Sequence, residues 1–330
     1  MKFKILSLLL ALTLNGCGIF NESSESPPTL NRTDYALGTY ITVKTPDIPV
    51  TAASALDKAF ARLFGIEMIA SAKNPESELF YVNENAYGRD IIVSDELYSL
   101  LHTGRFYAQL TDGAFDIALG SIVELWGIGT ENARVPEAYE ITEALGNSGF
   151  EQLVLSEGER TVRFLREGLR IDLGAIAKGY AANEMKRVLV ESGVTDAILD
   201  LGGDIVVIGS DRRIGIADPR NSAEICAIVT ISDKAVMTSG DYERFFDENG
   251  VHYHHIFDGT TGFSADSGII SATVIFECAM ISDVLSTAFF VMGVERAVEF
   301  AATMPEIGYI LIDNEMNFYY SENIEIEIIN

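Results

Sequence analysis

The sequence predicts an α+β fold in which layered sheets pack against helices within a single structural unit. Strand-like segments come in neighbouring pairs more often than they alternate with helices, which argues against a doubly wound parallel sheet. The chain has 330 residues, of which 48% are hydrophobic and only 8 are proline, so it can bury a large core. No linker rich in Pro, Gly or Ser interrupts residues 30–320, and we therefore expect one domain.

Hydrophobic spacing predicts the elements in order along the chain. Helices are expected at residues 52–69, 95–110, 176–192, 281–292 and 295–302. Strands are expected at residues 40–45, 153–155, 161–165, 170–173, 197–201, 205–208, 214–217, 226–231, 255–257, 271–276, 309–312 and 317–320. Gly202-Gly203-Asp204 separates two of these runs as a hairpin turn. Residues 322–329 alternate acids with isoleucine, which predicts an edge strand.

The N-terminus has the pattern of a bacterial lipoprotein signal. Lys2 and Lys4 precede an apolar run at residues 5–14, which is too short to span a bilayer but typical of a signal peptide. The following Leu14-Asn15-Gly16-Cys17 resembles a lipobox; the alternative is a buried cysteine in an N-terminal helix. We predict a signal peptide at 1–16, a lipidated Cys17 with a polar tether at 17–29, and a folded domain at 30–330.

The charge balance argues against nucleic acid as a partner. The chain has 23 Lys and Arg against 49 Asp and Glu, a formal charge of −26. Such a surface repels a polyanion, because phosphate contacts need a positive footprint. Three cysteines cannot form a disulfide framework, and Cys226 and Cys278 lie in apolar runs that are typical of buried thiols.

Two stretches combine glycine and acids in a way that packing alone does not require. TDGAFD at residues 111–116 ends a predicted helix; its alternative is a polar turn with a buried Phe. In IDLGAIAKGY at residues 171–180, a strand brings Asp172 to a glycine turn and Lys178 opens the next helix. A lysine at the positive N-terminal end of a helix is unfavourable unless an anion binds there. Free backbone N–H groups and Lys178 together would hold a phosphate at this position. The alternative is a lysine that pairs with a nearby acid.

Three of the four histidines fall between residues 251 and 256, beside the TSGDYERF stretch at 238–245. Strand alternation places His252 and His254 on one face and His255 on the other. No carboxylate lies at a telling offset, which disfavours a zinc site. Ser239 lacks the strand, elbow and helix that expose a hydrolase nucleophile.

Asp283 and Thr287 are four residues apart on a predicted helix, so their oxygens share one face. One interpretation is simple capping of the helix by Ser282 and Asp283. The other is an oxygen-rich Mg²⁺ site, because hard cations prefer carboxylate, hydroxyl and carbonyl oxygens. Beside a phosphate cradle, a divalent ion would neutralise a pyrophosphate in this acidic chain.

Together these motifs resemble the ApbE family, the FAD:protein FMN transferases of bacterial envelopes. The resemblance extends from Leu37-Gly38-Thr39 to about Gly293. Its pieces are SEL at 77–79 with Asn83, TDGAFD at 111–116, WG at 126–127, IDLGAIAKGYA at 171–181, LDLGGDI at 199–205, TSGDYERFF at 238–246, HHI at 254–256, TG at 261–262 and residues 283–287. It implies an ApbE-like, T-fold-related fold, and many members are lipoproteins.

The resemblance implies a flavin transferase that moves FMN from FAD to a Ser or Thr hydroxyl of a partner protein and releases AMP. Asp283, Thr287 and the carbonyl of Ala175 would hold Mg²⁺, and Lys178 would face a phosphate or the neighbouring substrate group. The implied FAD contacts are Leu37, Asn74, Ala114, Phe115, Asp116, Asp172, Lys178, Ile256 and Ser286. Either His255 or a metal-linked Asp would accept the hydroxyl proton.

At Asn74 the chain departs from the family, in which many members carry an aromatic residue suited to stacking on the flavin. Without that stacking, worth on the order of 1 kcal/mol, we expect weak FAD retention and hydrolysis of FAD to FMN and AMP under Mg²⁺. The alternatives are a flavin-binding lipoprotein without chemistry and a structural envelope lipoprotein.

The chain lacks the family's acceptor signature, an Asp followed a few residues later by Ser/Thr-Gly-Ala-Ser/Thr, so we expect modification of another protein. We expect that acceptor to be a membrane redox subunit. The location expected for the protein is the inner membrane, lipid-anchored and facing the periplasm.

Overall fold

The computed structural model describes residues 29–47 and 49–329. The predicted signal peptide, Cys17 and nearly all of the tether lie outside these residues. Within the described ranges, no helix is both long and apolar enough to cross a membrane.

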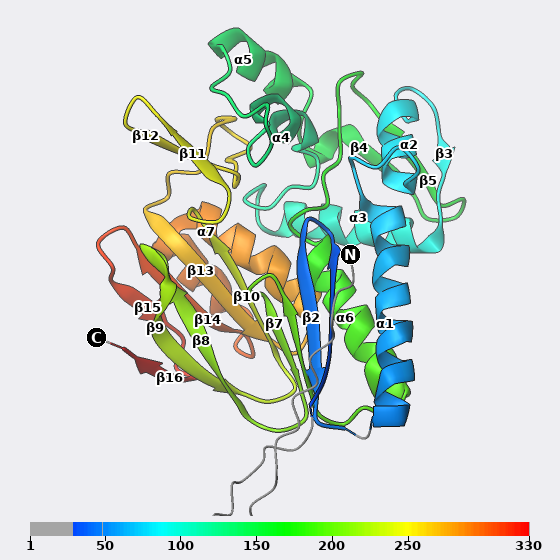
Figure 1. Ribbon diagram of the computed structural model, residues 1–330. Coiled ribbons are helices and arrows are strands. Elements are labelled where there is room, and N and C mark those ends of the chain that lie inside the picture. The colour runs from blue at the N-terminus through cyan, green and yellow to red at the C-terminus, as the bar shows by residue number, and fades with distance from the viewer. Residues whose placement is uncertain (1–28, 48, 330) are drawn as a thin grey trace, which may run out of the picture.

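An eight-stranded antiparallel sheet forms the centre of the molecule (Figure 1). In spatial order its strands are β1 (Leu30–Ala36), β2 (Thr39–Thr45), β6 (Ala197–Leu201), β7 (Ile205–Ile208), β10 (Ala235–Gly240), β13 (Ile269–Phe276), β14 (Gly308–Asp313) and β15 (Phe318–Tyr320). The predicted hairpin joins β6 to β7. Gly202 has a φ of +75°, and a Cβ there would lie 2.1 Å from Thr39 Oγ1, so this turn requires glycine.

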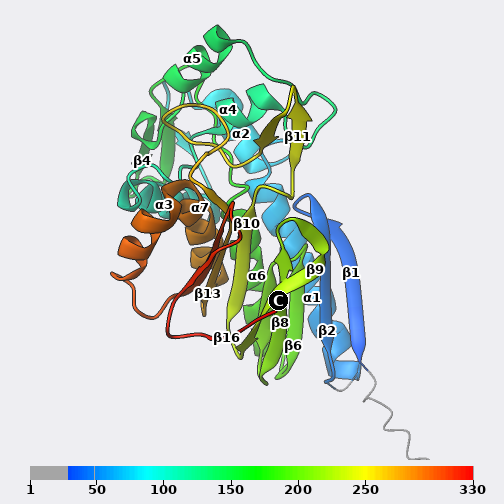
Figure 2. The ribbon, with the colours of Figure 1, turned by 90° about the vertical axis from the view of Figure 1, so that its left-hand side faces the viewer.

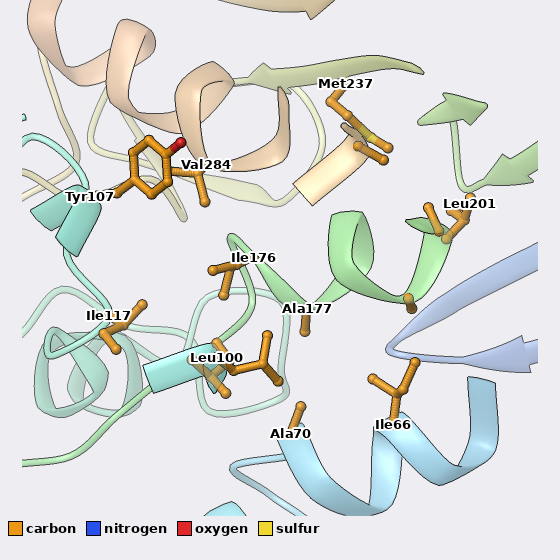
Figure 3. Packing of buried hydrophobic residues seen from close by; sticks show 14 of the residues in the cluster. Ile66, Ala70, Leu100, Tyr107, Ile117, Ile176, Ala177, Leu201, Met237 and Val284 are labelled. Carbon is orange, nitrogen blue, oxygen red and sulfur yellow. The ribbon is translucent and has the colours of Figure 1, made fainter. Parts of the chain in front are cut away.

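Three helices cover one face of this sheet, and the main core lies beneath them. They are α1 (Pro49–Ala70), α6 (Ala177–Glu191) and α7 (Ala279–Ala301). In Figure 3, Ala70 of α1 and Ala177 of α6 point toward each other, so small side chains let the two helices approach closely. Gly293, with a φ of 79°, interrupts α7 between the two helices that the sequence predicts there.

A second, three-stranded sheet lies against the opposite face. Its strands, in the spatial order β16-β9-β8, are β16 (Glu325–Ile328), β9 (Asn221–Ile231) and β8 (Arg212–Asp218). Buried residues such as Val207, Val229 and Ile310 form a separate core between the two sheets. Within residues 29–47 and 49–329, β16 pairs only with β9, which confirms the predicted edge strand.

The remaining elements lie together beyond one end of the sheets (Figures 1 and 2). They are α2 (Glu78–Asn85), β3 (Ile91–Ile92), α3 (Asp95–Leu110), α4 (Gly120–Trp126), α5 (Ala138–Gly146), a 3₁₀ turn (Phe150–Gln152), β4 (Leu153–Ser156), β5 (Thr161–Phe164), β11 (Phe245–Glu248) and β12 (Val251–His254). The mixture of helices and antiparallel sheets confirms the α+β prediction.

Two predicted strands are wrong. Residues 170–173 are extended but belong to no ladder; the N–H of Asp172 donates to the carbonyl of Ile117 in a loop. β12 ends at His254, and residues 255–257 form only an isolated bridge at Phe257. Residues 170–173 alternate in burial because one extended chain passes through the core, and such alternation does not require a partner strand.

Candidate active site

Three charged side chains from separate elements meet where the sheet joins the helices. Lys178 lies in the first turn of α6, Asp204 at the start of β7 and Asp283 in the second turn of α7. The Lys178 Nζ pairs with Asp204 Oδ2 and lies 4.0 Å from Asp283 Oδ1. The two carboxylates are only 4% and 6% exposed. We call these three residues the Lys178 cluster.

The protonation states of the Lys178 cluster follow from burial and charge. Burial alone would lower the pKa of Lys178, but Asp204 and Asp283 raise it well above its usual value, so the ammonium stays charged. Burial raises the pKa of Asp283 to about 6, against the opposing charge of Lys178. With one ammonium and two carboxylates, the ionised cluster has a net charge of −1 and favours an additional cation.

At the start of α6, where the sequence predicts a phosphate cradle, several donors have partners within the fold. The Gly179 N–H donates to Asp283 Oδ2 at 2.8 Å, and the Ala177 N–H donates to the carbonyl of Leu173 at 2.8 Å. Lys178 pairs with an acid, which was the alternative interpretation. A bound phosphate would therefore be favoured by a further positive charge, because the N–H groups of Ala177 and Gly179 and the Lys178 ammonium already have partners.

The predicted magnesium ligands fit a hard cation in their chemistry. Because the Gly179 N–H turns to Asp283, no described residue donates a hydrogen bond to the Ala175 carbonyl. Thr287, one helical turn after Asp283, has its Oγ1 3.1 Å from Ser239 Oγ. The described residues hold no cluster of three or more His, Cys, Asp or Glu that suits a metal, so carbonyl and hydroxyl oxygens must complete this site.

Ser286 lies behind the Lys178 cluster. Its hydroxyl donates to the Asp283 carbonyl at 2.8 Å and lies 2.9 Å from Ser239 Oγ. The side chain is fully buried. Within these contacts it positions α7 against β10.

The loop that follows α3 brings other predicted FAD contacts together. Asp116 accepts hydrogen bonds from the N–H groups of Ala118 at 2.7 Å and Phe150 at 2.9 Å. Burial raises the pKa of Asp116 to about 6, although these bonds oppose the rise. Asp172 lies beside this loop, and its Oδ1 accepts the Gly174 N–H at 2.7 Å. We call this group the Asp116 turn.

Phe115 and Ala114 precede Asp116 and are 1% and 7% exposed. The Phe115 N–H donates to Thr111 Oγ1, which fixes the turn, and the Phe115 ring packs in the main core. Any contact of these two residues with FAD would therefore come chiefly from their backbone.

The histidines have different environments. His254 is buried; it accepts the Ile256 N–H at Nδ1 and donates from Nε2 to the Ala265 carbonyl, so its role is structural. Nδ1 of His255 lies 3.3 Å from the Arg244 carbonyl, which can only accept, so this nitrogen holds the proton. Burial, and then the charge of Arg244, lower the pKa of His255 to about 3. His255 is therefore neutral at physiological pH, with Nε2 unprotonated.

The other predicted contacts lie in loops. Leu37 has a φ of 52°, and its N–H donates to Glu67 Oε1 at 2.8 Å. Ile256 is 5% exposed and packs in the main core. Among the described residues, Asn74 bonds only within the segment from Met68 to Ser77, and no hydrogen bond joins it to the Lys178 cluster.

Sequence reasoning missed two residues near the cluster. Asp204 was interpreted only as part of a turn and of the LDLGGDI piece, and its burial, which calls for a paired partner, is seen only in the structure. Arg244 packs over two glycines; a Cβ on Gly38 would lie 3.3 Å from its Nη2, and one on Gly129 3.4 Å from its Cδ. Its guanidinium forms no ion pair with any described residue.

Comparison with known proteins places this geometry in context. The family model described as "ApbE family" matches residues 37–311. A protein named FAD:protein FMN transferase from Treponema pallidum is 35% identical over 305 residues, covering 86% of this chain and 84% of its own length. A Klebsiella pneumoniae protein of the same name is 30% identical, covering 80% of this chain and 84% of its own.

Solved structures agree with the sequence comparison. The crystal structure of the ApbE protein from Thermotoga maritima matches with a TM-score of 0.83 and 32% identity, covering 89% of this chain and 97% of that one. The flavin transferase ApbE from Vibrio cholerae matches with a TM-score of 0.81 and 27% identity, covering 89% and 97%. The match in sequence, fold and motif order shows that this chain belongs to the ApbE family.

Proposed function

We propose that this chain transfers FMN from FAD to a Ser or Thr hydroxyl of an acceptor protein and releases AMP. The observation that carries the proposal is the Lys178 cluster, where a buried net negative charge and the free Ala175 carbonyl call for a cation. The relatives that match most of this chain are named FAD:protein FMN transferase.

The reaction breaks the phosphoanhydride of FAD and forms a phosphoester. The acceptor oxygen forms a bond to the FMN phosphorus, the bond from that phosphorus to the bridging oxygen breaks, and AMP leaves with that oxygen. The hydroxyl loses its proton to a base. Because little covalent chemistry falls to the protein, positioning and charge neutralisation carry the catalysis.

Asp283, Thr287 and the Ala175 carbonyl would hold Mg²⁺ in this site. When bound, the ion would neutralise the pyrophosphate and polarise its phosphoryl oxygens. Lys178 contributes a second fixed positive charge, held in place by Asp204. Asp204 is in turn fixed by the Thr238 N–H, which donates to its Oδ1 at 2.9 Å.

Two side chains, His255 and Asp283, can present an unprotonated atom that accepts the hydroxyl proton. His255 has a free Nε2 but a pKa of only about 3, which makes it a weak base. Asp283 has a pKa of about 6, closer to working pH, but it is also the expected metal ligand. A His255→Gln variant that keeps full transfer activity would leave Asp283 as the proton acceptor.

The test uses the full chain with FAD, MgCl₂ and a co-expressed candidate acceptor. We expect AMP by chromatography and an FMN adduct on the acceptor by mass spectrometry, both lost with EDTA. AMP without an acceptor would indicate the hydrolysis to FMN and AMP that Asn74 favours. FAD binding with no AMP under any condition would instead identify a flavin-binding protein and contradict the proposal.

We further propose that the protein is anchored through a lipidated Cys17 to the inner membrane, faces the periplasm, and modifies membrane redox subunits. The lipobox-like sequence at residues 14–17 supports the anchor. Metabolic labelling with a radioactive fatty acid, compared with a Cys17→Ala variant, tests it; equal labelling of both chains would exclude this anchor.

A further inference from the structure

The segment that carries Asp172, residues 170–173, is extended but lies in no ladder, so its backbone groups need partners from elsewhere in the fold. Two of these partners come from the chain that leads into α4. The Gly120 N–H donates to the Arg170 carbonyl at 3.0 Å, and the Asp172 N–H donates to the Ile117 carbonyl at 2.8 Å. In an extended chain these two groups point to the same edge, so the chain before α4 holds only that edge.

Asn83 of α2 holds the opposite edge. Its Nδ2 donates to the Ile171 carbonyl at 2.9 Å, and its Oδ1 accepts the Ile171 N–H at 2.8 Å. In an antiparallel ladder, a residue exchanges the same two bonds with the residue opposite. A side-chain amide can do so alone because it offers a donor and an acceptor side by side. Asn83 therefore takes the place of a partner strand.

The two bonds of Asn83 fix which side chains of the segment face the core. Ile171 and Leu173 are buried, whereas Asp172 between them points to the other face and is only partly buried. A shift of an extended segment by one residue would exchange its two faces. Because Asn83 bonds to both backbone groups of one residue, it specifies the register and with it the position of the Asp172 carboxylate.

Helix α2 is a fixed support for this contact. The Ser77 hydroxyl accepts the Phe80 N–H at 3.2 Å and caps the helix. Leu79 and Asn83 lie one helical turn apart on the same face, and Leu79 is fully buried in the main core. Packing of Leu79 therefore turns the Asn83 amide toward Ile171. In this way the SEL motif and Asn83 together hold the segment.

Arg170 also ties the segment to its surroundings, through ion pairs at the surface. It pairs with Glu84 of α2 and Glu124 of α4, both at 2.8 Å, but these carboxylates are 44% and 67% exposed. Exposed ion pairs contribute little, because water screens the charges and long side chains lose entropy when they are held. Asn83 is therefore the stronger constraint on its edge of the segment.

We propose that Asn83 is a positioning residue for flavin transfer, because it holds Ile171 and thereby places the Asp172 carboxylate for its contact with FAD. In this role Asn83 acts on FAD through Asp172 and not by direct contact. The inference rests on the proposed function for the FAD contact of Asp172, but it is tested by binding, without turnover.

The experiment is a double-mutant cycle between Asn83 and Asp172 in the full chain. Asn83→Ala removes both bonds to Ile171, and Asn83→Leu removes them while it keeps most of the side-chain volume. Asp172→Asn removes the charge but keeps an oxygen that can accept the Gly174 N–H. FAD binding is measured by flavin fluorescence in EDTA, and urea unfolding measures the stability of each variant.

Asn85→Ala is the matched control. Asn85 lies two residues further along α2, and its side chain donates to the Tyr81 carbonyl at 2.8 Å and accepts a hydrogen bond from Arg89. This variant also loses amide hydrogen bonds from α2, but none that reaches residues 170–173. It should bind FAD as the wild type does.

We expect Asn83→Ala and Asn83→Leu to weaken FAD binding by about tenfold in the folded protein. Added to Asp172→Asn, they should weaken it by no more than about twofold further. A merely structural Asn83 would lower stability and leave FAD affinity unchanged, which would overturn the proposal. The full tenfold loss in the Asp172→Asn background, or wild-type affinity in Asp172→Asn alone, would also overturn it. The expected affinities without AMP release by the wild type under Mg²⁺ would contradict the proposed function and leave the role of Asn83 supported.

Discussion

The Lys178 cluster and the Asp116 turn both bury carboxylates, but they use them differently. Asp116 directs one oxygen to Ala118 and the other to Phe150, both backbone N–H groups of its own region. Asp283 directs one oxygen to Gly179 and the other toward Lys178 at 4.0 Å, and the Ala175 carbonyl has no donor among the described residues. Both carboxylate oxygens of Asp116 accept hydrogen bonds from the backbone, whereas Asp283 can still bind a cation.

The difference separates structural acids from reactive ones more sharply than pKa does. Burial raises the pKa of both Asp116 and Asp283 to about 6, so the shift alone cannot distinguish them. What differs is the partners: backbone donors around one, and a side-chain cation with free oxygen ligands around the other. Substitution of each carboxylate therefore tests whether the two acids differ in role.

The largest effect is expected from Asp283→Asn. Asn can still accept the Gly179 N–H, so the fold should survive, but the cluster loses its ionised metal ligand. We expect AMP release to fall by about 10³-fold, with a thermal unfolding midpoint close to that of the wild type. AMP release within a few-fold of wild type would mean that this carboxylate is as structural as that of Asp116.

Breaking the ion pair is expected to act on stability. Lys178→Met leaves Asp204 buried without its cation, which should cost about 3–5 kcal/mol in the free energy of unfolding. The double variant Lys178→Met/Asp204→Asn removes both charges, and it should recover much of that loss while remaining inactive. Urea unfolding measures both values. An unstable double variant would show that the pair is needed for more than mutual neutralisation.

A smaller effect with a definite pH dependence is expected from Asp116→Asn. Asn has one acceptor oxygen where the carboxylate has two, so one backbone N–H loses its bond, at about 1–3 kcal/mol. The folded-state pKa of Asp116, about 6, lies above the unfolded value, so the folded state binds the proton more tightly. This acid therefore makes the wild type less stable as pH rises from about 4 to 6, and the variant should lose that slope.

Asp313→Asn is the control for this pH dependence. Desolvation alone would raise the pKa of Asp313, but hydrogen bonds from Asn317 and Glu315 lower it. Its contribution to stability is lost as the pH falls, opposite in sign to that of Asp116. Each substitution should change, in opposite directions, how the free energy of unfolding of the wild type depends on pH. Changes of the same sign in both variants would contradict the assignment.

The sequence predicted the positions of helices and strands better than it predicted which strands pair. The helix at 95–110 has the observed bounds because Ser94 caps it and its apolar spacing is regular. The segment 170–173 was mistaken for a strand because alternation reports burial and not pairing. Helices α2, α4 and α5 and strands β1, β3, β10 and β11 were not predicted, and each has fewer than ten residues.

The same limit applies to the site. Lys178 and Asp283 were both found as unusual residues in their own helices, but their shared partner Asp204 was not. Its pairing with Lys178 joins residues 26 positions apart and depends on how the β6–β7 hairpin packs beside α6. The two hydrogen bonds of Asp116 were equally invisible, because Phe150 lies 34 residues further along the chain. Sequence motifs identify candidate site residues, but tertiary contacts determine which side chains these residues pair with.

The smallest effect is expected at Asn74, which lies in neither of the two regions. Its side chain bonds to Met68 and Glu76 within its own loop, so Asn74→Tyr should leave stability unchanged. A ring there should stack on the flavin and add about 1 kcal/mol, roughly a fivefold tighter FAD complex. AMP release without an acceptor should fall because retained FAD excludes water. Asn74→Leu controls for size without aromaticity. Equal FAD affinity in the Tyr and Leu variants would place the flavin elsewhere and leave the Lys178 cluster as the principal determinant of FAD binding.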